Sequence, residues 1–267
     1  MGVRKGRGSA AMSRRLLISG GSGLLGKELR KRCTDAIVPP RSSLDIADAQ
    51  SVDRYFDEVR PEIYIHCAAI VGTVRCREDP ALTMRVNAGG VLNTVDAAVR
   101  HDCRFIYIST EYVFEGHRSE SGMFTEEAPV AGMSINARSK IAGEMFASAH
   151  PDHLIIRTNF FNRHFMGLGG TPYRGAFVDQ FTSRDFVDIL APEYMEAAVS
   201  DLQGVIHVGT ERKSQFDLMS RVFPDVKPIL RADVDASLPI DCSLDTSKWR
   251  GFKKQRALLS GAEGAIA

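Results

Sequence analysis

Three glycines stand at a spacing that suits the binding of phosphate groups. Gly20, Gly23 and Gly26 follow the apolar run 16–18 and open a stretch, 27–33, of helical character. In such a strand–turn–helix the first glycine permits a tight turn, the second lets main-chain N–H groups approach a pyrophosphate, and the third lets the helix pack closely. The helix N-terminus adds a partial positive charge. The spacing therefore predicts a dinucleotide-binding loop.

The residues after the second apolar run bear on which dinucleotide binds. A carboxylate there typically accepts from the ribose 2′-hydroxyl of NAD, whereas an arginine accommodates the 2′-phosphate of NADP. After Val38 the chain has two prolines, Arg41 and two serines, and its first carboxylate is Asp45. This order favours NADP(H) over NAD(H) with Arg41 as the phosphate contact; the alternative is that Arg41 is a solvated surface charge.

Short apolar runs alternate with helical stretches along the first 158 residues. The runs predicted as buried strands are 16–19, 36–38, 63–67, 104–109 and 154–157. The stretches predicted as helices are 27–33, 49–59, 81–99 and 139–149. Short strands separated by helices imply parallel βαβ units. We therefore predict an α/β fold, a Rossmann-type doubly wound parallel sheet.

The regularity fades beyond residue 158, where a glycine-rich loop occupies 167–172. We predict a flexible leader over 1–11, an NAD(P)-binding Rossmann domain over 12–158, and a smaller C-terminal substrate-binding lobe over 159–267 that partly returns to the sheet. Ligands of such folds bind at the carboxyl edge of the sheet.

Composition excludes several classes of partner. The 267 residues are 44% hydrophobic and 25% charged with a net charge of +1, which predicts no nucleic-acid or membrane partner. Five scattered cysteines without metal-ligand spacing predict neither a metal site nor a disulfide framework. The basic start lacks the apolar segment of a signal peptide, so we expect a cytoplasmic protein.

The chain resembles an extended short-chain dehydrogenase/reductase, closest to the dTDP-4-dehydrorhamnose reductase branch. The segments that carry this resemblance are 20–26, 41–48, 60–62, 66–69, 86–88, 108–116, 138–144 and 243–248. The resemblance implies a small-molecule substrate, in this branch a nucleotide sugar, and pairing as a homodimer. It does not identify the particular sugar.

The resemblance also implies roles for individual residues. Cofactor-binding positions are Gly20, Ser22, Gly23, Leu24, Leu25, Gly26, Arg41, Asp45, Ile46, Ala68, Ala69, Asn87 and Lys140. Thr110 would hydrogen-bond the substrate carbonyl oxygen, and Lys140 would hold the nicotinamide ribose. In the family a tyrosine four residues before that lysine donates a proton to the developing alkoxide, and this spacing places both on one helix face.

At that tyrosine position this chain has Asn136. An amide does not titrate in the useful range and cannot be a general acid, although Asn136 could orient a carbonyl. Another donor would be needed: Tyr112, Tyr173 or a water held by Asn136.

Two classes of function remain open from the sequence. The first is an atypical oxidoreductase, which reduces a keto group on a nucleotide-linked deoxysugar or a related small carbonyl with NADP(H). The alternative is a catalytically silent NADP-binding regulatory subunit, as in the β subunit of methionine adenosyltransferase, which this family resembles. A third possibility is an epimerase or dehydratase of the extended family, whose cofactor stays bound and oxidised.

Overall fold

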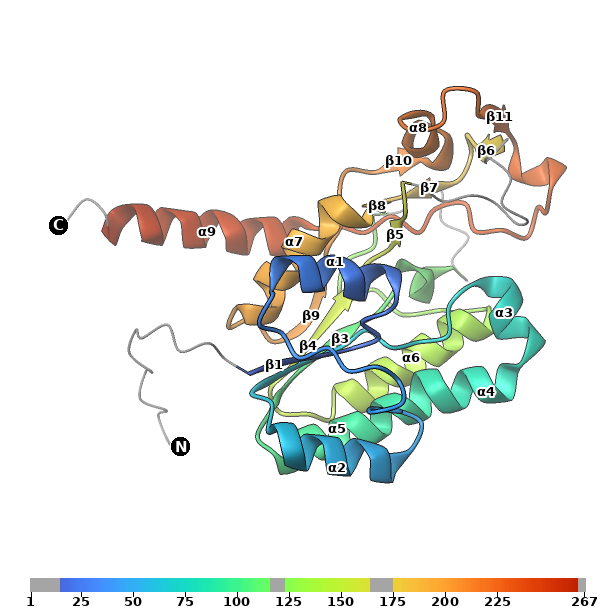
Figure 1. The fold of residues 1–267 in the computed structure, drawn as a ribbon. Coiled ribbons are helices and arrows are strands. Elements are labelled where there is room, and N and C mark those ends of the chain that lie inside the picture. The colour runs from blue at the N-terminus through green and yellow to red at the C-terminus, as the bar shows by residue number, and fades with distance from the viewer. Residues whose placement is uncertain (1–14, 116–122, 164–174, 264–267) are drawn as a thin grey trace.

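A parallel sheet forms the centre of the molecule (Figure 1). The computed structural model describes residues 15–115, 123–163 and 175–263. Within these ranges the strands of the sheet are β1 (Leu16–Ser19), β2 (Ile63–His66), β3 (Arg104–Ile108), β4 (His153–Arg157) and β9 (Gly204–His207), side by side in that order. Each strand pairs in parallel with its neighbour.

The predicted strand at 36–38 contributes a single parallel bridge, between Ile37 and Leu17. Ile18 N donates to Ile37 O over 2.9 Å and Ile37 N donates to Leu16 O over 2.8 Å. Pro39 and Pro40 follow immediately and have no N–H to continue the ladder. The segment therefore lies beside β1, on the side away from β2.

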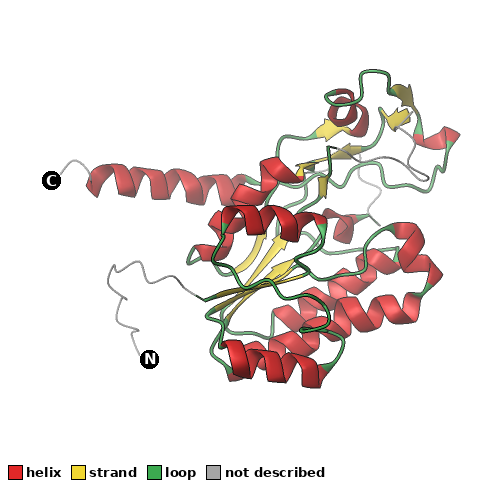
Figure 2. Cartoon of the chain, in the orientation of Figure 1, coloured by secondary structure: helices red, strands yellow, loops and turns green. Residues whose placement is uncertain are grey.

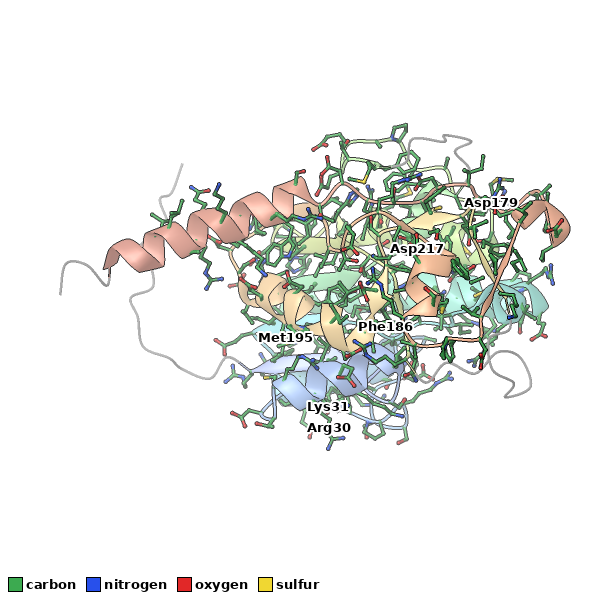
Figure 3. All side chains as sticks on the ribbon, turned by 90° about the horizontal axis from the view of Figure 1, so that it is seen from above. Arg30, Lys31, Asp179, Phe186, Met195 and Asp217 are labelled. Atoms are coloured by element: carbon green, nitrogen blue, oxygen red, sulfur yellow. The ribbon has the colours of Figure 1, made fainter. Side chains whose placement is uncertain are left out.

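Helices cover both faces of the sheet (Figure 2). One face carries α2 (Ala49–Val59), α5 (Gly90–Arg100) and α6 (Ile135–Ala147), and the other carries α1 (Leu24–Arg32) and α7 (Val187–Val199). Figure 3 shows Arg30 and Lys31 on α1 and Met195 on α7, the two neighbouring helices of the second face. A separate apolar cluster lies under each face, so the predicted doubly wound fold is confirmed.

The helix predicted over 81–99 consists of three successive pieces. These are α4 (Pro80–Met84), a π-helix (Arg85–Gly89) and α5, and the short α3 (Thr73–Glu78) precedes them. π-helical turns widen a helix locally and often occur at functional sites. Here the widened turn contains Asn87, whose contacts are described below.

The chain beyond residue 158 forms a small lobe and also completes the sheet. Its strand pairs are β5 (Phe160–Phe161) with β8 (Asp185–Phe186), β7 (Phe181–Thr182) with β10 (Lys213–Ser214), and β6 (Gly175–Phe177) with β11 (Lys227–Ile229). The helix α8 (Gln215–Ser220) packs on β6. Because α7 and β9 belong to the central layers, the lobe is interrupted by a return to the sheet.

The last helix, α9 (Ser247–Glu263), begins against β9 and extends away from the body (Figure 1). Trp249 anchors it and is 2% exposed. Among the described residues we find no helix with the length and apolarity that a membrane span requires.

Candidate functional site

The glycine loop between β1 and α1 is packed so closely that two of its positions exclude a side chain. Gly20 has φ +73°, and a Cβ there would lie 2.7 Å from Ala68 N. A Cβ at Gly26 would lie 2.4 Å from Gly20 O, which is main chain and cannot move aside. Gly23 N donates to Gly20 O over 2.9 Å and closes the turn. The first turn of α1 therefore starts directly behind the loop.

A cleft of about 360 Å³ opens at this loop. It lies at the carboxyl ends of β1 and β2, with β2 on one side of β1 and the 36–38 segment on the other. This is the point at which the strand order reverses, where open α/β sheets bind their ligands. The lining residues are Ser19, Gly20, Gly21, Ser22, Gly23, Pro39, Arg41, Leu44, Asp45, Ile46, Cys67, Ala68, Ala69, Ile70, Val71, Arg75 and Val86.

Most of the predicted cofactor-binding residues meet in this cleft. Those that line it are Gly20, Ser22, Gly23, Arg41, Asp45, Ile46, Ala68 and Ala69. Leu24, Leu25, Gly26, Asn87 and Lys140 are not lining residues. The Leu25 side chain is 5% exposed and packs in the core. For these residues contact with a cofactor stays a prediction.

Arg41, the predicted phosphate contact, forms an ion pair within the cleft. Its Nε and Nη2 lie 3.2 Å and 3.1 Å from one carboxylate oxygen of Asp45, and its side chain is 76% exposed. The other Asp45 oxygen accepts from Ala47 N and fixes the loop. Since an exposed ion pair is worth at most about 1 kcal/mol, Arg41 can exchange Asp45 for a stronger anion.

Asn87 supports the cleft from behind. Its Oδ1 accepts from Ile70 N over 2.7 Å, and its Nδ2 donates to Ile70 O over 2.8 Å and to Ser139 Oγ over 3.0 Å. Asn87 is buried and only 1% exposed. The amide thus holds the loop after β2 and ties it to α6. Sequence reasoning missed this positioning contact, because it joins two elements that are separated along the chain.

Lys140 lies beneath the end of β3. Its Nζ donates to Ile108 O over 2.8 Å and lies 4.8 Å from the centre of the Tyr107 ring. Burial lowers the pKa of Lys140 to about 8, against the opposing effects of Cys67 and Glu144. Burial raises the pKa of the Cys67 thiol to about 12, although Lys140 lowers it. Because Ile108 ends β3, the neighbour of β2, Lys140 lies at the same edge of the sheet as the cleft without lining it.

Asn136 lies in the first turn of α6, one turn before Lys140. Its Oδ1 lies 3.8 Å from Cys76 Sγ, the donor of a weak hydrogen bond, and its main-chain oxygen accepts from Ser139 Oγ over 2.7 Å. Burial raises the pKa of the Cys76 thiol. Neither side chain can therefore release a proton readily near neutral pH.

Thr110 and Tyr112 follow the end of β3. The Thr110 hydroxyl accepts from Tyr112 N over 3.3 Å and caps the 3₁₀ turn Glu111–Phe114. Because the hydroxyl accepts in this bond, it can still donate its own hydrogen, as the predicted carbonyl contact requires. Although Arg184 lowers the pKa of Tyr112, burial and Glu111 outweigh it, so the phenol pKa is raised.

Glu111 joins this strand end to the C-terminal lobe. Its carboxylate accepts from Thr182 Oγ1 over 2.6 Å and from Asn159 Nδ2 over 2.9 Å, and it lies 3.8 Å from Arg184 Nε. Burial of this residue, which is 1% exposed, raises its pKa. The pKa of Tyr112 likewise responds to Arg184 and Cys242 of the lobe. Tyr173, another predicted donor, lies outside the described residues, as does the 1–11 leader.

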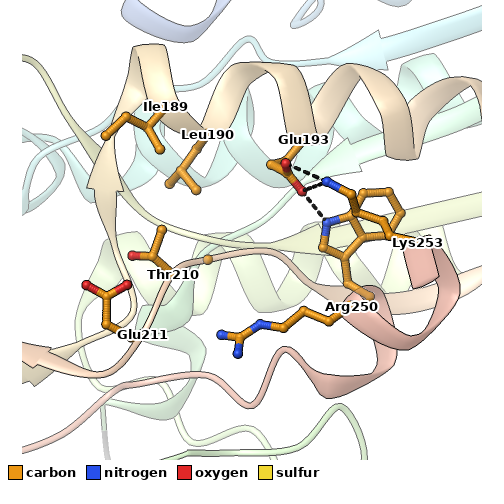
Figure 4. A pocket seen from close by; sticks show the side chains of 9 residues that line it. Ile189, Leu190, Glu193, Thr210, Glu211, Arg250 and Lys253 are labelled. Atoms are coloured by element: carbon orange, nitrogen blue, oxygen red, sulfur yellow. Dashed lines mark hydrogen bonds and ion pairs between the residues drawn. The ribbon is translucent and has the colours of Figure 1, made fainter. Parts of the chain in front are cut away.

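A second hollow, of about 480 Å³, lies between α7 and α9 (Figure 4). Two of its charged side chains pair with each other: Glu193 accepts from Lys253 Nζ over 2.7 Å and 2.8 Å, and also from Trp249 Nε1 over 2.7 Å. It shares no lining residue with the cleft at the glycine loop. Because most of the predicted cofactor-binding residues line the cleft at the glycine loop, we assign the candidate site to that cleft.

The fold and the glycine-lined cleft define a Rossmann-type protein of the extended short-chain dehydrogenase/reductase class. A model of the RmlD substrate binding domain matches residues 14–191, so the chain belongs to that family. The resemblance inferred from the sequence motifs is confirmed.

Named relatives agree with this assignment. A dTDP-4-dehydrorhamnose reductase of Aggregatibacter actinomycetemcomitans is 30% identical over 185 residues, which are 67% of this chain and 61% of that protein. One of Sinorhizobium fredii is 26% identical over 214 residues, 73% of this chain and 72% of that protein. The chain thus spans about three fifths of the first relative's length and nearly three quarters of the second's.

Solved structures are similar over almost the whole chain. A dTDP-4-dehydrorhamnose reductase from Bacillus anthracis str. Ames in complex with NADP has a TM-score of 0.78 at 28% identity, covering 90% of this chain and 92% of that one. The Thermus thermophilus UDP-glucose 4-epimerase complexed with NAD has a TM-score of 0.74 at 21% identity, covering 90% and 93%. This second likeness concerns the fold alone.

Proposed function

We propose that this chain uses NADP(H) to reduce a keto group on a nucleotide-linked deoxysugar. The observation that supports this most is a cleft lined by the glycine loop at the carboxyl edge of the sheet, the same edge at which Lys140 is bonded to the end of β3. The dTDP-4-dehydrorhamnose reductases among the relatives, one of them solved in complex with NADP, support the same reaction.

The residues of the cleft fit a dinucleotide. Side chains at Gly20 and Gly26 would collide with main chain, and their absence lets a pyrophosphate approach the first turn of α1 and the loop N–H groups other than that of Gly23, which is bonded to Gly20 O. NADPH, when bound, supplies a hydride to the carbonyl carbon. Lys140 would hold the nicotinamide ribose, and the Thr110 hydroxyl would donate to the carbonyl oxygen and stabilise the charge that develops there.

The reduction also requires a proton for the alkoxide, and this chain lacks the tyrosine that donates it in the family. Asn136 cannot supply it, and losing a positioned acid costs roughly 10²–10⁴-fold in rate. This favours a second candidate, a silent NADP-binding subunit, on one specific observation: Asn136 and its neighbour Cys76 are both poor proton donors.

The deciding experiment compares the wild-type chain with Asn136→Tyr. We would measure NADPH oxidation with dTDP-4-dehydrorhamnose, with Asn136→Gln as a control that keeps the amide. Turnover by the wild type supports reduction, and loss of that turnover in Tyr112→Phe would identify Tyr112 as the donor.

If Asn136→Tyr oxidises NADPH and the wild type does not, the silent subunit is favoured. The site would then contain everything that the reaction needs except a proton donor. NADPH binding without turnover by either form would contradict reduction of this sugar. The absence of NADP binding would contradict both candidates.

A further inference from the structure

A second arginine, Arg75 of α3, lines the cleft together with Arg41. The two approach from different parts of the sheet. Arg41 follows the 36–38 segment on one side of β1, whereas Arg75 follows β2 on the other side. No sequence motif indicated Arg75, although a basic residue soon after a strand end is a signal that could have found it.

The charges of the cleft do not balance. Arg41 and Asp45 pair with each other, and these two with Arg75 are the charged side chains that line the cleft. Within the described part of the chain Arg75 forms neither a hydrogen bond nor an ion pair, and its side chain is exposed. The cleft therefore carries one uncompensated positive charge, which suits an anion.

The backbone that presents Arg75 is held in place by its neighbours. Cys76 is fully buried, and its Sγ lies 3.5 Å from Ile70 O. The side-chain amide of Asn87 forms hydrogen bonds with both the main-chain N–H and the main-chain carbonyl of Ile70. Thr83 Oγ1 lies 3.4 Å from Cys76 O. The cleft wall and the start of α3 thus form one fixed unit, which lowers the cost of ordering Arg75 on a ligand.

We propose that Arg75 binds a phosphate group of the dinucleotide held in this cleft. A guanidinium offers a planar fork of N–H donors that matches two phosphate oxygens. The inference rests on the proposed NADP(H) cofactor and adds a specificity-determining residue to it. The phosphate is either the 2′-phosphate, which NADP alone carries, or the pyrophosphate, which NADP and NAD share.

The test measures the Kd of NADP and of NAD by calorimetry on the full chain, for the wild type and Arg75→Gln. The matched control is Arg77→Gln, because Arg77 is exposed on the same helix and does not line the cleft. We expect Arg75→Gln to weaken NADP binding by roughly 10–100-fold, the range for a lost hydrogen bond to a charged group, while Arg77→Gln changes it less than about twofold.

The NAD measurement identifies the phosphate. An equal loss for NAD and NADP assigns Arg75 to the pyrophosphate, and a loss for NADP alone assigns it to the 2′-phosphate. An Arg75→Gln protein that binds both as the wild type does, with an unchanged thermal unfolding midpoint, would overturn the proposal. If the wild type binds neither cofactor, the proposed function itself is wrong, and Arg75 has no dinucleotide to bind.

Discussion

The Lys140 ammonium group donates a 2.8 Å hydrogen bond to the main-chain oxygen of Ile108, the last residue of β3. This bond fixes the charge at the edge of the sheet where the cleft opens. Burial disfavours the charged form and lowers the pKa of Lys140 to about 8. The charge is therefore present at neutral pH and lost within the accessible alkaline range.

We predict that NADP affinity falls as pH rises from 7 to 9. If NADP binds only the charged form, titration with a pKa of about 8 removes about tenfold in affinity across this range. The measurement is the Kd by calorimetry at several pH values. Lys140→Met should bind more weakly with a flat profile, and an equally steep profile in that variant would show that another group titrates.

The same pKa makes an opposite prediction for stability. Between about 8 and 10.5 the folded chain has released this proton while the unfolded chain retains it. Because stability rises with pH wherever the unfolded state binds more protons, the contribution of Lys140 to stability increases across this window. Its effect on unfolding thus has the opposite sign to its effect on binding.

Gly26 and Gly251 provide a matched pair of helical glycines. A Cβ at Gly26 would lie 2.4 Å from Gly20 O and 2.5 Å from Gly21 Cα, whereas a Cβ at Gly251 meets nothing within 4 Å. We expect Gly26→Ala to destabilise the chain by roughly 1–3 kcal/mol and to weaken NADP binding. Gly251→Ala should stabilise it by about 0.5–1 kcal/mol through helix propensity. Urea unfolding measures both, and equal effects would contradict the close packing of the loop.

The positions of most strands along the chain and the dinucleotide loop could be predicted from the sequence because both depend on local patterns. Short apolar runs and a glycine spacing are properties of adjacent residues, and β1 and α1 occur where these patterns lie. The return of α7 and β9 to the sheet was predicted only in outline. Their placement depends on packing between distant segments, such as α7 against α1, which no local pattern encodes.

The supporting contacts of the site were harder to predict for the same reason. Asn87, which bonds Ile70, lies in a π-helical turn within the predicted helix, and Arg75 lines the cleft next to Cys76, which is buried beside Ile70. The lobe contacts of Glu111 with Thr182 join residues 71 positions apart. The spacing of residues in the sequence predicts which side chains lie together within one helix or strand. It does not predict which residues of different elements come into contact.

Arg41 and Asp45 make a prediction about cofactor choice. Binding of a 2′-phosphate requires Arg41 to leave the carboxylate that it contacts at 3.1 Å. Asp45→Asn removes this competition and should raise NADP affinity by up to about fivefold, the equivalent of an exposed ion pair, with little change for NAD. Arg41→Gln should weaken NADP binding selectively. Parallel Kd measurements for both cofactors check this, and equal changes for NAD would mean that Arg41 does not contact the 2′-phosphate.

The ion pair of Glu144 and Arg157 is buried beneath the site and makes the strongest prediction for stability. Arg157 Nη2 lies 2.8 Å from Glu144 Oε2, and Ser109 Oγ donates to Oε1 over 2.5 Å. The side chains are only 7% and 9% exposed. Glu144→Gln leaves the guanidinium charge buried without its counter-charge, so we expect a loss of roughly 3–5 kcal/mol in the free energy of unfolding.

The matched control for this pair is Lys31→Gln, which breaks an ion pair with Glu28 whose lysine side chain is 67% exposed. Solvent screens that pair, so its loss should cost less than about 1 kcal/mol. Urea denaturation of the two variants and the wild type provides the comparison. Since removing both buried charges relieves the unpaired one, Glu144→Gln combined with Arg157→Gln should be less destabilised than the sum of the two single variants. If the loss of unfolding free energy in the double variant equals the sum of the two single losses, the two side chains contribute independently. That result would contradict an energetic coupling between Glu144 and Arg157.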